Sequence, residues 1–188
     1  SEGSSATIQF NDNTGIVMKE LTSININEFE NSKQNPKFKA ELLKGKIVIE
    51  SGSIAKNNNG EMIVDITTSS IGLRGTRIDA DLKPNGKSNI SLAEDSFGNV
   101  GEIEVTLEGQ TSNITSTEQV LEILENNETL SREKTNDEKE EAKTISETLV
   151  KSSKIDEEEI TKQLQKKLAD GNLQDANNDG VVDESDVE

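Results

Sequence analysis

Residues 72–82 read GLRGTRIDADL, and this stretch decides how the first half of the chain is interpreted. Its second part alternates, because Ile78, Ala80 and Leu82 are separated by single aspartates. Such alternation is the period of a strand with one buried face. Just before it stands Gly75, and glycine permits a bend or a close backbone approach within a strand-like run. The stretch therefore predicts a strand that begins at a glycine corner.

The same alternation recurs from residue 5 to about residue 108. The apolar sets are Ala6/Ile8/Phe10, Ile24/Ile26, Phe38/Ala40/Leu42, Ile47/Ile49, Met62/Val64/Ile66, Ile90/Leu92 and Ile103/Val105/Leu107. Turn residues separate them at 12–15, 57–60, 84–86 and 97–99, and Asn-Gly supplies the positive φ that tight hairpins need. Many short strands at this spacing predict a β-rich sandwich or roll.

From about residue 113 the apolar spacing becomes helical. A first helix is predicted to carry Val120, Ile123, Leu124 and Leu130 on one face, with Ser116 and Gln119 at the spacing of a capping box. A second helix is predicted from about 136 to 152, with Ala142, Ile145 and Leu149 on one side.

A third helix has the clearest start signal. Asp156 can act as its N-cap with Glu159 three residues later, and Gly171 is placed to end it. The sequence therefore predicts an α+β chain with segregated elements. Its parts are a β-domain at 1–114, a helical segment at 115–171 and a loop segment at 172–188.

The β-region resembles the FecR-like domain of secreted and surface proteins of bacteria. The resemblance is carried by ATIQFNDNTGIVMKELTSININEFE at 6–30, KFKAELLKGKIVIESGSIAK at 37–56, TTSSIGLRGTRIDADL at 67–82 and VGEIEVTLEGQTSNI at 100–114. The resemblance implies a further glycine-containing β-segment before ATIQF, so we expect either that the chain is a fragment or that another molecule supplies the missing strands. The iron-citrate regulator that gave the family its name also has an anti-sigma segment and a membrane span. Neither is recognised in this sequence, so sigma-factor signalling is not expected here.

The segment Arg74-Gly75-Thr76 lies at a hallmark of that family, and two interpretations are open. In the first it is a structural motif, a corner that defines the fold, where Thr76 hydrogen-bonds the local backbone. In the second Arg74 contacts a ligand, because its planar guanidinium can bind carbonyls or a carboxylate. The first interpretation is favoured.

The C-terminus reads DANNDGVVDESDVE from residue 175, which is the spacing of an EF-hand calcium loop. The predicted Ca²⁺ ligands are Asp175, Asn177, Asp179, the carbonyl of Val181, Asp183 and Asp186, with Gly180 at the sharp turn. Asp186 stands where an EF-hand has glutamate, and this resembles the loops of dockerins and related extracellular calcium repeats. A dockerin has two such loops and this chain has one, so cohesin docking is not predicted. An acidic solvated tail is the alternative.

Composition excludes several classes of function. The chain has 188 residues, a net charge of −17 and no Cys or His, so zinc sites, disulfides and Cys or His catalysis are ruled out. The acidic balance and the missing basic patch argue against nucleic acid and anionic membranes as partners. The absence of an apolar run of about 18 residues argues against a membrane span.

Three candidate functions are compatible with these observations. The favoured one is a non-catalytic structural or binding module of an exported bacterial protein, at the surface, outside the cell or in the periplasm, with calcium at its C-terminal loop. The alternative is a self-assembling subunit of a filament or surface layer that exchanges strands with copies of itself. An enzyme with paired carboxylates such as Asp79 and Asp81 is disfavoured, because alternate positions on a polar strand face are expected to be solvated.

Overall fold

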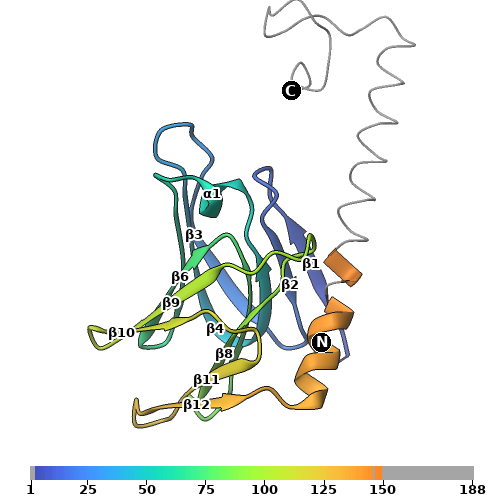
Figure 1. Ribbon diagram of the computed structural model, residues 1–188, viewed down its shortest axis with the longest axis vertical. Coiled ribbons are helices and arrows are strands. Elements are labelled where there is room, and N and C mark those ends of the chain that lie inside the picture. Colours follow the sequence, from blue (N-terminus) through green and yellow to red (C-terminus); the bar gives the residue numbers. More distant parts are fainter. Residues whose placement is uncertain (1–2, 146, 150–188) are drawn as a thin grey trace, which may run out of the picture. The chain divides into compact units, whose positions relative to one another are not determined.

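The computed structural model describes residues 3–145 and 147–149 of the chain (Figure 1). Its strands are β1 (Ala6–Gln9), β2 (Gly15–Met18), β3 (Ser23–Glu30), β4 (Lys37–Glu50), β5 (Glu61–Ile66), β6 (Ser69–Arg74), β7 (Arg77–Leu82), β8 (Ser88–Ala93), β9 (Glu102–Leu107), β10 (Gln110–Ile114), β11 (Gln119–Ile123) and β12 (Thr129–Glu133). A short helix, α1 (Ser53–Lys56), follows β4, and a longer helix occupies residues 136–145 and 147–149. This longer helix is called the 136–149 helix below.

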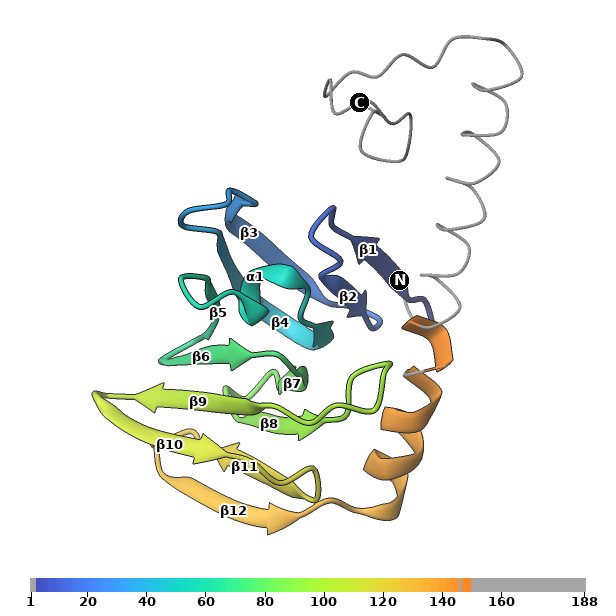
Figure 2. The ribbon, with the colours of Figure 1, turned by 45° about the horizontal axis from the view of Figure 1, so that its top comes forward.

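The long strand β4 organises the described sheet. Its first half, up to Lys44, pairs antiparallel with β3 and parallel with β5, whereas its second half, from Gly45, pairs antiparallel with β2 and β7. Gly45 therefore lies where the pairing changes, and its φ of +84° is a value that glycine adopts without steric cost. The sheet curls about β4, with the order β10-β9-β6-β5-β4-β7-β8-β11-β12 along its main path (Figure 2).

The curl encloses a mainly aliphatic core. Side chains that the alternation predicted to be inward are buried, among them Ile47, Ile49, Met62, Val64, Ile66, Ile78, Ala80, Ile90, Leu92, Ile103 and Val105. The rings of Phe10, Phe29 and Phe38 meet at one end, with centroids 4.9–6.4 Å apart. The β-rich prediction is thus confirmed, in the form of a curled sheet continuous through β4. Ile26 is an exception at 38% exposed, because the register of β3 shifts beside it.

The helix predicted around residues 116–130 is wrong, because this segment forms the hairpin of β11 and β12. β11 also pairs with β8, and it is covered on both faces. Leu121 and Ile123 face the core, while Val120 is buried on the opposite face, so the apolar residues imitate helical spacing. Ser116 begins a turn, in which its hydroxyl accepts a hydrogen bond from the Glu118 amide at 3.3 Å. The β-region therefore extends past the predicted boundary at residue 114, to Glu133.

The second predicted helix is confirmed within the described residues. Ile145 and Leu149 pack against Val17 of β2 and Val48 of β4, on the face of the sheet opposite the main core. The helix begins with a capping box that the sequence reading did not use. The Thr135 amide donates to the Glu138 carboxylate at 2.8 Å, and the Glu138 amide donates to the Thr135 hydroxyl at 3.3 Å.

Replacing Glu138 with glutamine is expected to weaken the fold in a pH-dependent way. The Arg132 guanidinium binds this carboxylate with two nitrogens, at 2.7 and 2.8 Å, and together with Thr135 it lowers the pKa of Glu138 from 4.5 to about 2. A lowered pKa stabilises the fold above pH 4.5, and this stabilisation is lost as the pH falls toward 2. Because both side chains are partly exposed, we expect a loss of about 1 kcal/mol at pH 7.

Urea unfolding of the native chain and the Glu138→Gln variant at pH 7, 4 and 3 measures this effect. The difference between them should shrink as the pH decreases below 4.5. Glu140→Gln, an exposed neighbour on the same helix, is the matched control and should show no such trend. A difference that stays constant with pH would contradict the assignment of the stabilisation to the Glu138 charge.

Several predictions fall outside the described residues. These are the end of the second helix after residue 149, the third helix at 156–171 and the loop segment from residue 172, including all six calcium ligands. Among the described residues, no helix has the length and apolar character needed to cross a membrane.

Candidate functional site at the RGT corner

The Arg74-Gly75-Thr76 segment carries the chain from one half of the curled sheet to the other. Arg74 ends β6, opposite Glu102 of β9, and Arg77 begins β7, opposite Glu50 of β4. The change of direction takes place at Gly75, whose φ of +63° lies in the left-handed region. The predicted glycine corner is therefore where the sequence placed it.

Thr76 ties this corner to the neighbouring strands. Its side chain is fully buried, and its amide donates to the Ser51 hydroxyl at 2.8 Å. The Ser51 amide donates back to the Thr76 carbonyl at 3.0 Å, and the Thr76 hydroxyl donates to the Ala93 carbonyl at 3.3 Å. The ends of β4 and β8 are thus fastened to the start of β7, which is the geometry of a fold-defining corner.

A second glycine packs directly on the corner backbone. A Cβ atom on Gly101 would lie 2.2 Å from the carbonyl oxygen of Arg74 and 2.7 Å from that of Gly75. By contrast, a Cβ on Gly75 itself would meet only the Lys56 side chain, at 3.7 Å. Gly75 is therefore required for its backbone conformation, whereas Gly101 is required for close approach.

The Arg74 side chain is exposed, and it has no hydrogen-bond or ion-pair partner among residues 3–145 and 147–149. It lines a groove of about 260 Å³ with Glu102 and Glu104 of β9. The corner itself is held by the backbone and by Thr76, so the guanidinium of Arg74 is free to contact a ligand. The interpretation of Arg74 as a ligand contact stays a prediction.

The loop between β8 and β9 stands beside this corner and is held by two buried acids. The Asp95 carboxylate accepts hydrogen bonds from the amides of Phe97, at 3.0 Å, and Asn99, at 2.8 Å, and from the Asn99 side chain. The Glu50 carboxylate accepts from the amide of Ser96 at 3.0 Å and from its hydroxyl. The loop is therefore fixed internally and to the end of β4.

Hydrogen bonding decides the ionisation of Asp95. Burial alone would raise its pKa, but the bonds from Asn99 and Phe97 and the charge of Lys56 hold the pKa of this carboxyl below its ordinary value. Asp95 is therefore a carboxylate at neutral pH, in the state that accepts all of these hydrogen bonds.

This rigid loop presents Phe97 to solvent, with 81% of the side chain exposed. Among the described residues, the Lys56 ammonium lies above its ring, 5.9 Å from the centroid. The sequence predicts a turn at 97–99 but does not distinguish Phe97 as a contact residue. The available signal was an aromatic residue inside the turn DSFGN, without an alternating apolar neighbour.

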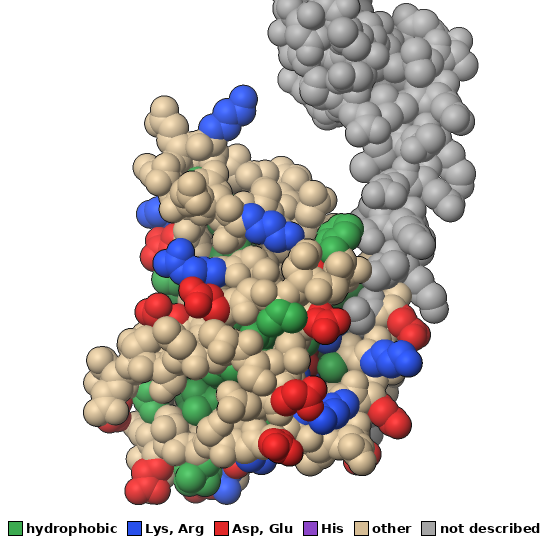
Figure 3. All heavy atoms as spheres, viewed as in Figure 1, with side chains coloured by type: hydrophobic (Ala, Val, Ile, Leu, Met, Phe, Trp, Pro, Cys, Tyr) green, Lys and Arg blue, Asp and Glu red, His purple; other side chains and the backbone are tan. Residues whose placement is uncertain are grey.

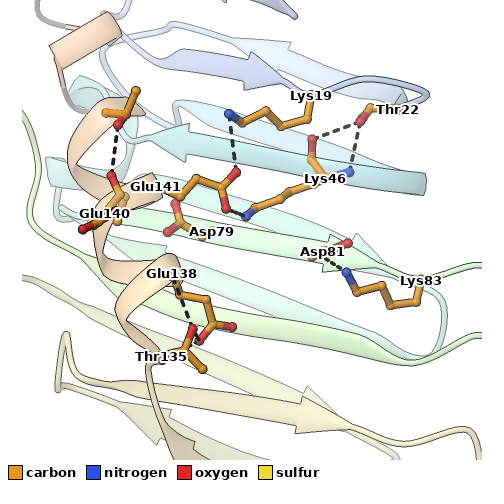
Figure 4. A network of polar contacts seen from close by, with 12 residues as sticks. Lys19, Thr22, Lys46, Asp79, Asp81, Lys83, Thr135, Glu138, Glu140 and Glu141 are labelled. Atoms are coloured by element: carbon orange, nitrogen blue, oxygen red, sulfur yellow. Dashed lines mark hydrogen bonds and ion pairs between the residues drawn. The ribbon is translucent and has the colours of Figure 1, made fainter. Parts of the chain in front are cut away.

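The acidic pair Asp79 and Asp81 was expected to be solvated, and for Asp79 this expectation is wrong. Its side chain is 13% exposed, because the 136–149 helix covers this face of β7. Figure 4 shows Asp79 beside Glu141 of that helix, which is bound by Lys46 and by Lys19 at 3.4 Å. Burial raises the pKa of Asp79, although the charges of Arg77, Lys134 and Lys46 oppose the rise. Asp81 pairs with Lys83 at 2.6 Å.

Metal binding is not indicated within the described part of the chain, where no cluster of three acidic residues could hold an ion. Comparison of the whole sequence with protein-family models finds a match to "FecR protein" over residues 1–97, just over half of the chain. The chain belongs to the FecR family. The family match includes the RGT corner and ends within the Phe97 loop, so β9 to β12 lie beyond it.

Two solved structures share the fold of this FecR chain. Both are crystal structures of a candidate anti-sigma factor from Parabacteroides distasonis ATCC 8503, with TM-scores of 0.55 and 0.57 and identities of 12% and 13%. Each similarity covers 70% of this chain but only 56% or 57% of the other protein. At this identity the similarity shows the fold alone. A comparison with curated proteins found no match.

Proposed function

We propose that this FecR chain is a non-catalytic binding module of an exported bacterial protein, and that the Phe97 loop is its contact with a partner protein. The observation that carries this proposal is the exposure of Phe97. The other three phenylalanines of the chain cluster around the core, whereas Phe97 is 81% exposed. Large exposed aromatic side chains are common anchors of protein interfaces.

The loop is also built to lower the entropy cost of binding. Asp95 and Glu50 already fix the backbone on both sides of Phe97, so little further ordering is needed when a partner binds. Val100, 47% exposed, and the unpaired Arg74 guanidinium belong to the same corner and would extend the contact. Aromatic and arginine side chains are both enriched in protein interfaces.

Two further findings support a role through protein binding. The solved structures with this fold are of a candidate anti-sigma factor, a regulatory class of protein. The face in Figure 3 carries acidic and basic side chains interspersed, without the broad basic area that nucleic-acid binding needs.

Site-specific photocrosslinking in the source bacterium tests the proposal. A photoreactive residue at position 97 is expected to give a discrete adduct with a partner protein. The same residue at Leu130, which is 52% exposed on β12, is the matched control and should give none. Thermal unfolding would confirm that both variants are folded. Adducts of equal yield from both positions, or none from position 97, would contradict the proposed contact.

The C-terminal loop at 175–186 is proposed to bind one Ca²⁺ ion through the six ligands named above. Support comes from the ligand spacing, and loops of extracellular modules bind calcium with Kd of about 10⁻⁴–10⁻³ M, a range that extracellular calcium fills. Calorimetry should detect one ion per chain, and Asp175→Ala should abolish the heat. A flat titration up to about 5 mM calcium would instead identify an acidic tail.

Self-assembly is the alternative, and β1 favours it, because within the described residues this strand pairs only with β2. β1 carries no charged residue and its pairing with β2 is continuous, whereas the edge strand β3 has register shifts and two glutamates that protect it. If copies add strands here, sedimentation velocity should show association that rises with concentration and falls in Thr7→Lys. A monomer at every concentration would exclude this alternative.

A further inference from the structure

Arg77 is an arginine buried beneath the 136–149 helix with most of its hydrogen-bonding capacity unused. The residue is 2% exposed, and one terminal nitrogen, Nη2, donates to the Ala142 carbonyl at 2.9 Å. Its Nε lies 4.0 Å from the Asp79 carboxylate, beyond hydrogen-bond distance. Within the described residues, Nε and Nη1 of Arg77 are buried without a hydrogen-bond partner, as is the facing Oδ1 of Asp79. Buried N–H donors without an acceptor cost free energy, so the site favours an added acceptor.

A pocket of about 290 Å³ opens beside this guanidinium. It lies between the helix, the end of β8 and the segment before β11, and its charged lining is Arg77, Lys134, Lys139, Lys143, Glu94 and Glu118. Four cationic groups therefore face two carboxylates, in a chain whose net charge is −17. The volume lies at the lower limit for small-molecule pockets, which suits a ligand of a few atoms.

The cationic side chains of the pocket differ in how many hydrogen bonds and ion pairs they already make within the described residues. Lys139 is paired with Glu118, and the Lys134 ammonium donates to the Leu92 carbonyl at 2.6 Å. Lys143 is exposed at the rim and has no hydrogen bond or ion pair within the described part of the chain. Burial lowers the pKa of Lys134, the charge of Asp79 opposes this decrease, and the nearby charge of Arg77 adds to it. An anion between these groups would relieve their repulsion.

We propose that this pocket binds a small oxyanion, a carboxylate or a phosphate group, between the Arg77 guanidinium and the ammonium groups of Lys134 and Lys143. A planar guanidinium matches the geometry of both anions, and charge-assisted hydrogen bonds are among the strongest in proteins. The bound anion would join β7 to the 136–149 helix. This site lies on the face of the sheet opposite the core and is independent of the proposed Phe97 contact.

The test uses the full chain, labelled with ¹⁵N, and inorganic phosphate as the probe at constant ionic strength set by chloride. The Arg77 Nε–H resonance reports on the guanidinium beside the pocket, and it should shift in a saturable way at millimolar phosphate. A parallel titration with acetate distinguishes the two kinds of ligand. Tighter binding of acetate would assign the site to a carboxylate, and tighter binding of phosphate would assign it to a phosphate group. Saturation by either anion supports the proposal.

Variants make the test specific. Lys143→Glu reverses an exposed charge at the rim and should weaken binding at least about threefold, while Lys87→Glu, an exposed lysine outside the pocket, should leave it unchanged. Arg77→Lys keeps the charge but removes the planar group, and it should weaken binding at least about tenfold. If that variant does not fold, the Lys143→Glu arm decides.

Two results would overturn the proposal. The first is an Arg77 Nε–H resonance that does not shift in a saturable way with either anion. The second is a saturable shift with the same affinity in Lys143→Glu as in the native chain. In either case Arg77 would serve only to hold the helix through Ala142.

Discussion

Replacing Gly101 with alanine is expected to destabilise the fold by at least about 3 kcal/mol, or to prevent folding, because the added methyl overlaps fixed backbone. It would lie 2.2 Å and 2.7 Å from the carbonyl oxygens of Arg74 and Gly75. These oxygens cannot move independently, since Thr76 is hydrogen-bonded to Ser51 and to Ala93 on either side of the corner.

Gly98 provides the matched control for this prediction. It lies in the Phe97 loop with a φ of +80°, and a Cβ there would meet nothing within 4 Å. Gly98→Ala should therefore cost only the left-handed backbone penalty of about 1–2 kcal/mol. Urea unfolding of both variants measures the difference. Equal costs would show that the RGT corner tolerates displacement, which contradicts its role as a fixed corner.

Asp12→Ala is expected to cost about 3 kcal/mol, because it leaves several buried donors unpaired. The Asp12 carboxylate, 2% exposed, accepts from the Thr14 amide at 2.9 Å, the Thr14 hydroxyl at 2.7 Å and the Ile54 amide at 3.4 Å. The Thr14 hydroxyl in turn accepts from the Gly52 amide at 3.1 Å. This network joins the β1–β2 turn to the chain between β4 and α1.

Two further variants calibrate that value. Asp12→Asn keeps the shape and one acceptor oxygen, and should cost less than the alanine substitution. Asp81→Ala removes an acid whose partner, Lys83, is half exposed, and should cost no more than about 1 kcal/mol. Chemical denaturation compares the three. An Asp12→Ala cost as small as that of Asp81→Ala would show that the network does not stabilise the fold.

Alternation predicts most of the strands that have one buried face, because it depends only on burial, although β6, with Ile71 and Leu73 buried, is not among the predicted sets. Ile78, Ala80 and Leu82 are examples, and the turns at 12–15 and 97–99 are confirmed by positive φ at Asn13 and Gly98. Where both faces of a strand are covered, alternation is lost. For this reason the sequence pattern does not predict β2, which has consecutive buried residues, and it predicts a helix where β11 lies.

Two capping-box signatures of equal local quality had different outcomes. Ser116-x-x-Gln119 precedes β11, whereas Thr135-x-x-Glu138 starts the 136–149 helix and was overlooked. Their tertiary contacts distinguish the two segments. Pairing with β8 holds the first segment in a strand. The ion pair between Arg132 and Glu138 stabilises the start of the helix in the second segment. Local propensity could not separate them.

The candidate site was predictable only in part. The corner at Gly75 follows from a glycine in a strand pattern. The exposure of Phe97 depends instead on Glu50, which is distant in sequence, and on Asp95, which the fold buries. The burial of Asp79 and Arg77 likewise depends on a helix more than fifty residues later in the chain. Such long-range packing leaves no periodic signal in the sequence.

Amide hydrogen exchange tests most directly the central claim, a preorganised Phe97 loop held at a structural corner. The Thr76 amide should exchange only with global unfolding, and the Phe97 and Asn99 amides should be protected by their bonds to Asp95. Protection of all three would support a rigid contact loop. Exchange of the Phe97 and Asn99 amides at unprotected rates would show a flexible loop, and would contradict the proposed binding surface.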